Sequence, residues 1–410
     1  MRCVALCFGL IVFAVGSEQL ASETPAQPPP GQTAKQAPQQ RNARDDLIVG
    51  EPIRAGNLTV FPISSRLPRN DDPYITLDEG LRAGTVEVLE VGATASPRGS
   101  SASARRSGNS RPQTTLEAAG SVNRVSVINR SGKPLYLMPG EIIMGGKQDR
   151  TIGNEMIVES AEKPVEVEVY CVEHGRWSGR DEAAGAEMLQ SVAESSGERI
   201  DRPTAQRLAK EARSGKFVAS AGSLSSSARR TVQEGKGQAD VWNEVGMANR
   251  RSSVQTQTDT FTANYADDGV RKDLKAYLDR LQSPVAAERQ AVGAIVAING
   301  KVTAADVFQS TPLFLKLWPK LLKSYALDAA TAARQPSANR VCSRDDAQAF
   351  LRKAFAAREE GGRRPRRIGG KPSRGSRRGE LLGQGSTGIC EGRSRREGRR
   401  RVRELRRKRP

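Results

Sequence analysis

The sequence predicts an α+β fold, with antiparallel strands in the first half of the ordered chain and mostly helices in the second. Apolar and polar residues alternate up to Trp177, and apolar residues recur at helical spacing after it. A change of this kind separates strands from helices. Residues 293–308 then interrupt the helices with two apolar runs joined by Asn299-Gly300, a typical hairpin turn. We expect a single domain over residues 46–335, in which this hairpin returns to the main sheet.

The first 17 residues have the features of a secretory signal peptide. Arg2 supplies a positive charge, residues 4–16 are apolar or glycine, and Val15 and Ser17 suit the cleavage positions. The apolar run is shorter than the roughly twenty residues that span a membrane as a helix. We expect a periplasmic or extracellular protein with no transmembrane segment after removal of the signal. Residues 18–45, rich in Pro, Gln and Ala, are predicted to be a disordered linker.

Short apolar clusters separated by glycine and proline predict the strands. They cover residues 47–61 in several pieces, then 85–91, 122–128, 135–137 and 165–172, with a helical turn at 77–81 and a loop at 96–115. In residues 165–172 valine alternates with glutamate, which places Cys171 on the buried face of that strand.

Helical spacing of apolar residues predicts the second half of the domain. Candidate helices cover residues 183–192, 203–212, 227–234, 239–247 and 270–281. Another begins at Thr311 and Pro312, a suitable N-cap and first residue, and Pro319 should kink or divide it. The segment 336–360 is predicted to end the ordered chain with a helix, centred on residues 347–357.

The glycine pair Gly145-Gly146 is the first candidate binding site. Glycine permits positive φ, and successive backbone N–H groups that point the same way can bind an anion. Lys147 and Arg150 follow at once and add positive charge. The alternative is a plain hairpin turn followed by a solvated polar strand. Residues 173–177 are expected to lie at a neighbouring strand end. The candidate ligand-binding residues are Gly145, Gly146, Lys147, Gln148, Asp149, Arg150, Glu173, His174, Arg176 and Trp177.

A single histidine, His174, excludes most common catalytic designs. It is too few for a His-rich metal site, and no Cys-x-x-Cys pair exists, so we expect no metal. A Ser–His–acid triad would need this histidine, and no Gly-x-Ser-x-Gly elbow is present. We expect no cofactor. Removal of the signal leaves three cysteines, which set no disulfide framework, although a Cys171–Cys342 pair stays open.

Two functions fit this inventory. The first is an exported, non-catalytic binding or interaction module for an anionic small molecule or a protein. The second is an enzyme that acts on a phosphate- or ADP-ribose-like ligand at the Gly145–Arg150 turn, with Glu141, Asp149 or Glu173 as acid or base.

The positive charge of the chain is concentrated in its tail. Of the net charge of +19, residues 361–410 carry +15, with 17 Arg and 11 Gly among their 50 residues. The tail has no aromatic residue to stack on bases, so we do not expect nucleic-acid binding. We expect no strand and no packed side chain in it. A frameshifted gene and a genuine basic tail both account for such a composition.

Five segments carry a family resemblance. They are LMPGEIIMGGKQDR at 137–150, CVEHGRW at 171–177, ADVWNEV at 239–245, GAIVAINGKVTAADVF at 293–308 and LFLKLWPKLLKSYALDA at 313–329. With them, residues 46–330 resemble a bacterial family of uncharacterised domains that is named for its association with ADP-ribosylglycohydrolase and rhodanese-phosphatase-superfamily proteins. The resemblance implies ADP-ribose- or nucleotide-linked biology and assigns no catalytic residue.

Overall fold

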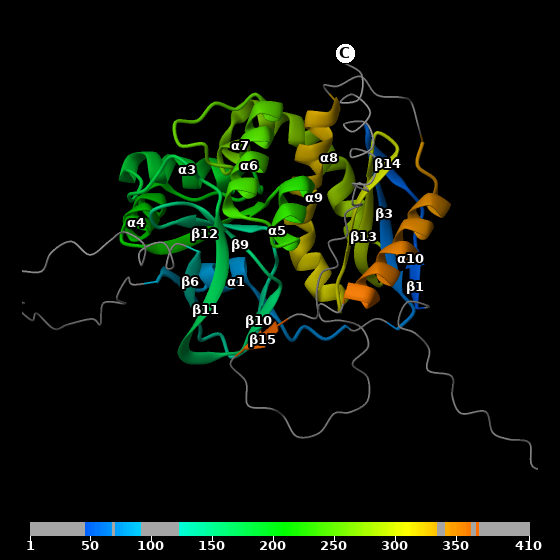
Figure 1. Ribbon diagram of the computed structural model, residues 1–410, viewed down its shortest axis with the longest axis horizontal. Helices are drawn as coiled ribbons and strands as arrows, with labels where there is room; N and C mark the ends of the chain where they lie inside the picture. Colours follow the sequence, from blue (N-terminus) through cyan, green and yellow to red (C-terminus); the bar gives the residue numbers. More distant parts are fainter. Residues whose placement is uncertain (1–45, 68–69, 92–122, 334–340, 362–365, 369–410) are drawn as a thin grey trace, which may run out of the picture. The chain divides into compact units, whose positions relative to one another are not determined.

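Strands from both halves of the chain are shared among three sheets (Figure 1). The computed structural model describes residues 46–67, 70–91, 123–333, 341–361 and 366–368. The predicted signal peptide, the linker, the loop at 96–115 and the tail beyond residue 368 lie outside the described residues. All the described residues belong to one compact unit.

The first sheet is a closed antiparallel barrel. Its strands, in the order β11-β6-β5-β12-β8-β9, are β11 (Ala161–Cys171), β6 (Arg124–Asn129), β5 (Val86–Glu90), β12 (Lys216–Ser223), β8 (Glu141–Gly145) and β9 (Arg150–Ile152). The alternation predicted for β11 is confirmed, since Val167 and Val169 are fully buried. β12 comes from the helical half and completes the barrel between β5 and β8.

The second sheet joins the two ends of the domain. It has the order β1-β3-β13-β14, with β1 (Leu47–Val49), β3 (Leu58–Ser65), β13 (Ala291–Ile298) and β14 (Lys301–Val307), while β2 (Ile53–Ala55) also pairs with β3. The predicted hairpin is confirmed, and Asn299 and Gly300 have the positive φ values of 50° and 70° that a two-residue turn requires. β13 is buried along its whole length because helices pack on both faces of this sheet.

The third sheet corrects the prediction for the tail. It has the order β15-β10-β7-β4, with β15 (Arg366–Ile368), β10 (Met156–Val158), β7 (Leu135–Leu137) and β4 (Ile75–Thr76). β15 lies beyond residue 361, where we expected no strand and no packed side chain. It pairs with the edge of β10 through its backbone, which places few demands on side chains, and Ile368 packs against the barrel core.

The predicted helices are confirmed, and the structure adds one short helix that was not predicted, α7 (Ala263–Ala266). The confirmed helices are α1 (Leu77–Arg82), α3 (Glu182–Glu194), α4 (Arg202–Arg213), α5 (Ser226–Gln233), α6 (Gln238–Ser252), α8 (Asp268–Ala286), α9 (Thr311–Ala333) and α10 (Arg344–Gly361). Side chains of Asp181, Asp201, Ser225 and Asp267 cap the starts of α3, α4, α5 and α8 by accepting backbone N–H groups. Pro319 does not divide α9, because burial of this helix among β12, β13 and α8 outweighs the local preference.

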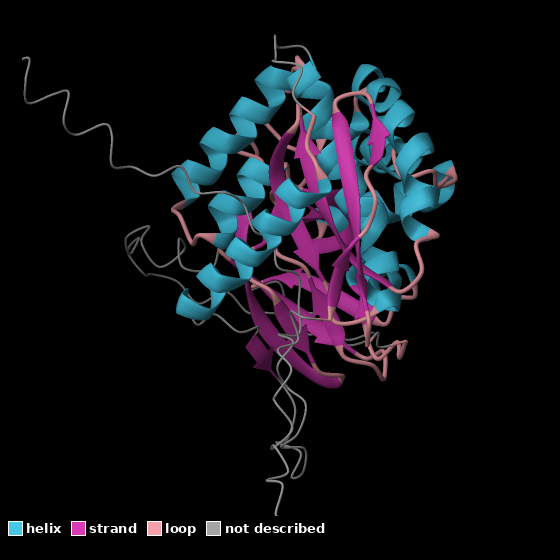
Figure 2. Cartoon of the chain, turned by 90° about the vertical axis from the view of Figure 1, so that its right-hand side faces the viewer, coloured by secondary structure: helices cyan, strands magenta, loops and turns pink. Residues whose placement is uncertain are grey.

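Figure 2 shows the strands lying between helices on either side. No helix in the described ranges combines the length and the apolar composition needed to cross a membrane. Cys171 and Cys342 are both buried as thiols, so the disulfide left open by the sequence is not formed.

Candidate functional site

The Gly145-Gly146 pair forms a hairpin turn between β8 and β9. Gly145 has φ 140°, and a Cβ there would lie 2.1 Å from the carbonyl oxygen of Lys216. The glycine is therefore required because β12 passes too close for a side chain. The N–H group of Gly146 donates to the carbonyl oxygens of Ala212 and Lys216, and that of Lys147 donates to Glu90 at 2.8 Å. These N–H groups already have acceptors within the protein, which favours the plain hairpin.

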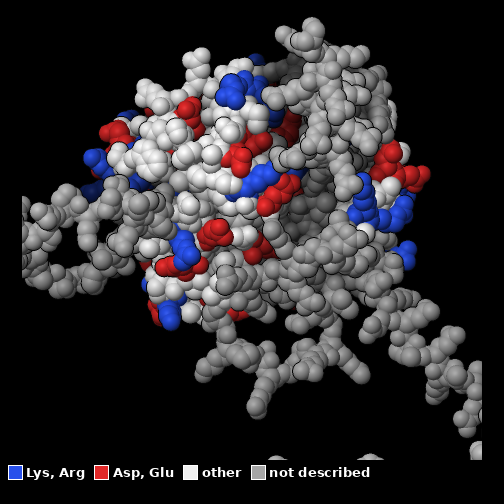
Figure 3. All heavy atoms as spheres, viewed as in Figure 1, with Lys and Arg blue, Asp and Glu red and all other residues white. Residues whose placement is uncertain are grey.

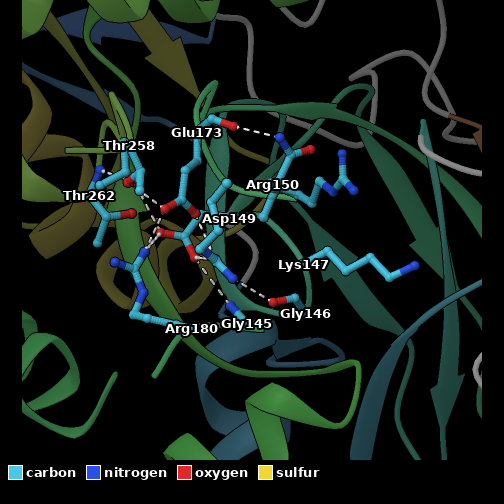
Figure 4. Close-up of polar contacts among 12 residues, drawn as sticks. Gly145, Gly146, Lys147, Asp149, Arg150, Glu173, Arg180, Thr258 and Thr262 are labelled. Carbon is cyan, nitrogen blue, oxygen red and sulfur yellow. Dashed lines mark hydrogen bonds and ion pairs between the residues drawn. The ribbon is translucent and has the colours of Figure 1, made fainter. Parts of the chain in front are cut away.

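Next to this turn lies a carboxylate–arginine cluster, formed by Asp149, Glu173, Arg176 and Arg180. Figure 4 labels Asp149, Glu173 and Arg180. Arg176 contacts Glu173 at 2.6 Å and Asp149 at 3.4 Å. Arg180 contacts the same two carboxylates at 2.9 and 3.4 Å. The side chains of Asp149 and Glu173 are 2% and 0% exposed. Two negative and two positive groups therefore balance one another, with the carboxylates and Arg176 buried and Arg180 partly exposed.

Neutral donors complete the cluster. Thr258 donates to Glu173 at 2.7 Å, Thr260 donates to Asp149 at 3.1 Å, and the backbone N–H of Asp149 donates to Glu173 at 3.0 Å. Burial opposes ionisation of Glu173, but the hydrogen bond from Arg176 and the charge of Arg180 outweigh it and hold the pKa of Glu173 below its ordinary value. Burial and the neighbouring Glu173 raise the pKa of Asp149. The adjoining cavity is about 20 Å³, which holds a water molecule and nothing larger.

The ten residues predicted for the ligand site do not converge. The structure brings together Gly145, Gly146, Gln148, Asp149, Glu173 and Arg176. Lys147 is exposed and extends away from the carboxylates (Figure 4), and Trp177 is 59% exposed.

Arg150 and His174 also lie apart from the cluster. The guanidinium of Arg150 contacts the thiol of Cys171. The exposed ring of His174 packs edge-on against Trp242 with 4.4 Å between ring centroids. Ligand binding by the predicted set stays a prediction.

A second region, which we call the α9 cleft, has far more space. Its volume is about 1620 Å³, and it is lined by residues of α1, β5, α3 and the loop after it, α4, β12, α8 and α9. Three lysines of α9 reach it: Lys316, Lys320 and Lys323. They are three or four residues apart, and this spacing places them on one side of the helix.

Two of these lysines are paired with carboxylates. Lys320 contacts Asp78 at 2.6 Å and also the buried Glu141. Burial opposes its charge, but these two carboxylates outweigh that effect and raise the pKa of Lys320. Lys316 contacts Asp72 at 2.8 Å and Glu79 at 3.1 Å.

Lys323 differs from both. Its Nζ donates to the hydroxyls of Ser195 and Ser196, at 2.9 Å each, and lies 4.4 Å from the centroid of the Tyr265 ring. It is only 2% exposed, and no carboxylate of the described chain forms an ion pair with it. Burial lowers the pKa of Lys323 to about 7. Gly222 makes room for it, since a Cβ there would lie 2.9 Å from Lys323 Cε.

The sequence did not single out this cleft. The apolar stripe of α9 predicted a core helix, and lysines on the remaining side are typical of a solvated face. The serines that contact Lys323 are 127 and 128 residues away along the chain. The available signal was that α9 is apolar around most of its circumference, which indicates that its lysine side is also covered.

Comparison with known proteins identifies a family. The profile of the ARG and Rhodanese-Phosphatase-superfamily-associated Protein domain matches residues 46–371, so the resemblance carried by the five segments is confirmed. No curated protein and no solved structure is significantly similar to the chain.

Proposed function

Because the chain belongs to the ARG and Rhodanese-Phosphatase-superfamily-associated Protein domain family, we propose that it is an accessory binding module that takes a small anionic ligand into the α9 cleft. The ligand class is a phosphate- or ADP-ribose-like molecule. The family name, which records association with other proteins, supports the accessory role.

Lys323 is the observation that carries the proposal. Its ammonium form is buried without a carboxylate within ion-pair distance, and a buried charge lacking a counter-ion costs several kcal/mol. A ligand anion would supply that counter-ion. The cleft, at about 1620 Å³, exceeds the roughly 300–1,000 Å³ of typical small-ligand sites, so a nucleotide-sized molecule fits.

The charge distribution favours a small-anion site in the cleft and does not indicate a broad basic surface that would bind a polyanion. On the face in Figure 3, the described Lys and Arg side chains are interspersed with Asp and Glu. A mixed surface of this kind gives little attraction to a polyanion, whereas one uncompensated ammonium group in a cleft attracts a small anion.

Titration calorimetry with inorganic phosphate, ADP and ADP-ribose tests the proposal. We expect binding by wild type and a loss of at least tenfold in affinity in Lys323→Met. Lys147→Ala, on the hairpin turn, is the matched control and should bind as wild type does. Equal affinity in Lys323→Met, or no binding of any of these anions at millimolar concentration, contradicts the proposal.

The affinity should also depend on pH. The groups that face Lys323 are Asp78 on α1, Glu198 after α3, Lys320 on α9 and Tyr265 on α7. An anion favours the protonated lysine, so affinity should be highest below pH 7 and should fall as pH rises through the lysine pKa of about 7. Binding near pH 7.5 should therefore take up protons, which calorimetry in buffers of different ionisation enthalpy measures.

We also propose that the module acts after export. The sequence of residues 1–17 supports this, and the test is independent of ligand binding. Residues 1–45 fused to a phosphatase that is active only outside the cytoplasm should confer activity, and Val4→Arg together with Leu10→Arg should abolish it. An inactive fusion that stays unprocessed in the cytoplasm would argue against export.

A further inference from the structure

We infer that Ser196 and Lys323 form a nucleophile–base pair that hydrolyses an acyl ester or amide in the α9 cleft. The inference shares the cleft with the proposed binding function but does not require recognition of an anion. Ser196 Oγ lies 2.9 Å from Lys323 Nζ, within the range of about 2.6–3.2 Å that joins a nucleophile to its base. Both residues line the cleft, with the serine exposed and the lysine buried.

Ser196, and not its neighbour Ser195, has the geometry of the nucleophile. Ser195 is buried, and its hydroxyl donates to the carbonyl oxygen of Val192 at 2.6 Å, at the end of α3. Its proton is therefore already used by the helix terminus. The hydroxyl of Ser196 instead accepts a hydrogen bond from Lys323 Nζ. When Lys323 is neutral, the proton of Ser196 can point at its nitrogen.

Lys323 also differs from its neighbours in its capacity to act as a base. Lys320 is held as a cation by Asp78 and Glu141, and Lys316 by Asp72 and Glu79. The environment of Lys323 contains the positive charge of Lys320, the ring of Tyr265, and the carboxylates of Asp78 and Glu198 beyond ion-pair distance. Because its pKa is lowered to about 7, a large fraction of the amine is neutral at physiological pH.

The reaction balances with water as the only co-reactant. Ser196 Oγ forms a bond to the acyl carbon while its proton passes to Lys323 Nζ. The bond from the acyl carbon to the leaving oxygen or nitrogen then breaks, and the leaving group takes that proton. Water attacks the acyl-Ser196 ester, gives its proton to Lys323, and releases the carboxylic acid as Ser196 recovers its hydrogen. The apolar side chains of Leu189, Val192 and Val218, which line the same cleft, provide surface for the acyl group.

The test is covalent labelling of the full-length chain by a fluorophosphonate, read by intact mass and peptide mapping. We expect a single adduct on Ser196, with a labelling rate that rises through pH 7 to a plateau. Ser196→Ala should form no adduct. Ser214→Ala is the matched control and should label as wild type does, because Ser214 is also an exposed serine just after a helix, but its hydroxyl donates to a backbone carbonyl and has no lysine partner among the described residues.

Lys323→Met and Lys323→Arg separate a base from a structural lysine. Both should label at least 100-fold more slowly, although Lys323→Arg keeps the positive charge and should keep part of the anion affinity. Hydrolysis of p-nitrophenyl butyrate should follow the same order. No adduct in wild type at pH 9, an adduct on another residue, or a wild-type rate in Lys323→Arg overturns the inference. Phosphate binding that depends on Lys323, without any labelling of Ser196, would support the proposed binding function and contradict the hydrolase. Labelling of Ser196 that depends on Lys323, without any phosphate binding, would support the hydrolase and contradict the binding function.

Discussion

The carboxylate–arginine cluster and the α9 cleft bury charge in opposite ways. In the cluster, Asp149 and Glu173 face Arg176 and Arg180, threonine hydroxyls supply further donors, and the adjoining cavity is about 20 Å³. In the cleft, Lys323 has hydroxyl partners, no carboxylate in ion-pair distance, and about 1620 Å³ of adjoining space. Buried charges that compensate one another indicate a structural role. A buried charge left uncompensated beside open space indicates a role with a ligand or substrate.

The largest expected effect is on the cluster. Arg176→Ala should destabilise the fold by about 3–5 kcal/mol, because it leaves two buried carboxylates with one remaining arginine. Urea unfolding followed by circular dichroism measures the change. Arg207→Ala, which removes an exposed i,i+4 pair with Glu211, is the control and should cost less than about 1 kcal/mol. A loss below about 1 kcal/mol in Arg176→Ala would remove the structural interpretation of the cluster.

Lys323→Met, by contrast with Arg176→Ala, should stabilise the fold at low pH. The folded pKa of about 7 lies below the ordinary value of 10.5, so the unfolded chain binds more protons between those values. Wild-type stability therefore rises with pH across that window, and the cost of the buried ammonium is fully present below pH 7. The free energy of unfolding of Lys323→Met should exceed that of wild type by on the order of 4 kcal/mol near pH 6, and the difference should vanish above the unfolded pKa of 10.5.

The control for this pH dependence is Lys316→Met. Burial opposes the charge of Lys316, but its hydrogen bonds with Asp72 and Glu79 outweigh burial and raise its pKa. Its replacement should therefore show no gain in stability at pH 6. Thermal melts of the three proteins at several pH values suffice, and parallel curves for both variants would show that Lys323 is ordinarily charged.

Two glycines, Gly145 beside the carboxylate–arginine cluster and Gly222 beside Lys323 in the α9 cleft, test how far each region can adapt to an added methyl group. An added Cβ at Gly145 would meet the Lys216 backbone at 2.1 Å, which cannot yield without moving β12. At Gly222 the nearest atom is the flexible end of Lys323, at 2.9 Å. We expect Gly145→Ala to cost about 3 kcal/mol and Gly222→Ala about 1–2 kcal/mol, since both also have positive φ. Gly84→Ala, at φ 66° with open space around it, gives the backbone strain alone. Equal losses at Gly145 and Gly222 would contradict this ranking.

The smallest effects belong to the exposed residues of the predicted site. Lys147→Ala and Trp177→Ala should each change stability by less than about 0.5 kcal/mol. Both should bind phosphate as wild type does if the ligand enters the α9 cleft. Loss of binding in either variant would return the ligand site to the hairpin turn.

Local patterns in the sequence predicted most helices and strands, but they did not predict strands, such as β12 and β15, whose place depends on pairing with distant segments. The valine alternation of β11, the Asn299-Gly300 turn and the apolar stripe of α9 are short-range signals, and each marked its element correctly. β12 was missed because Ala219, Ser220 and Gly222 give it little β signal, and its place depends on pairing with β5 and β8. β15 was missed for a related reason, since its pairing uses backbone groups in a segment dominated by arginine.

The candidate site was harder to predict than the fold. Charged residues close together in sequence drew attention to Asp149 and Arg150, and proximity to Gly145-Gly146 suggested an anion site. The structure shows that the charged groups of such a cluster can pair with one another and that its backbone N–H groups can find acceptors within the protein. The contact between Lys323 and Ser196 joins segments 127 residues apart, and no periodicity encodes a meeting of that kind.

The pairing of β3 with β13 delays completion of their sheet during synthesis, because β13 is made long after β3. Ile63 lies opposite Gly293, and the strands between them belong to other sheets. At ribosomal rates of roughly 5–20 residues per second, the partner of β3 emerges roughly 10–50 seconds after β3 itself. During that interval β3 has one of its two edges exposed, and an apolar strand with an open edge is prone to aggregate. The second sheet cannot form completely until β13 has been made. A holding chaperone or a secretion channel that engages the nascent chain in that interval would therefore meet a chain that is still incompletely folded.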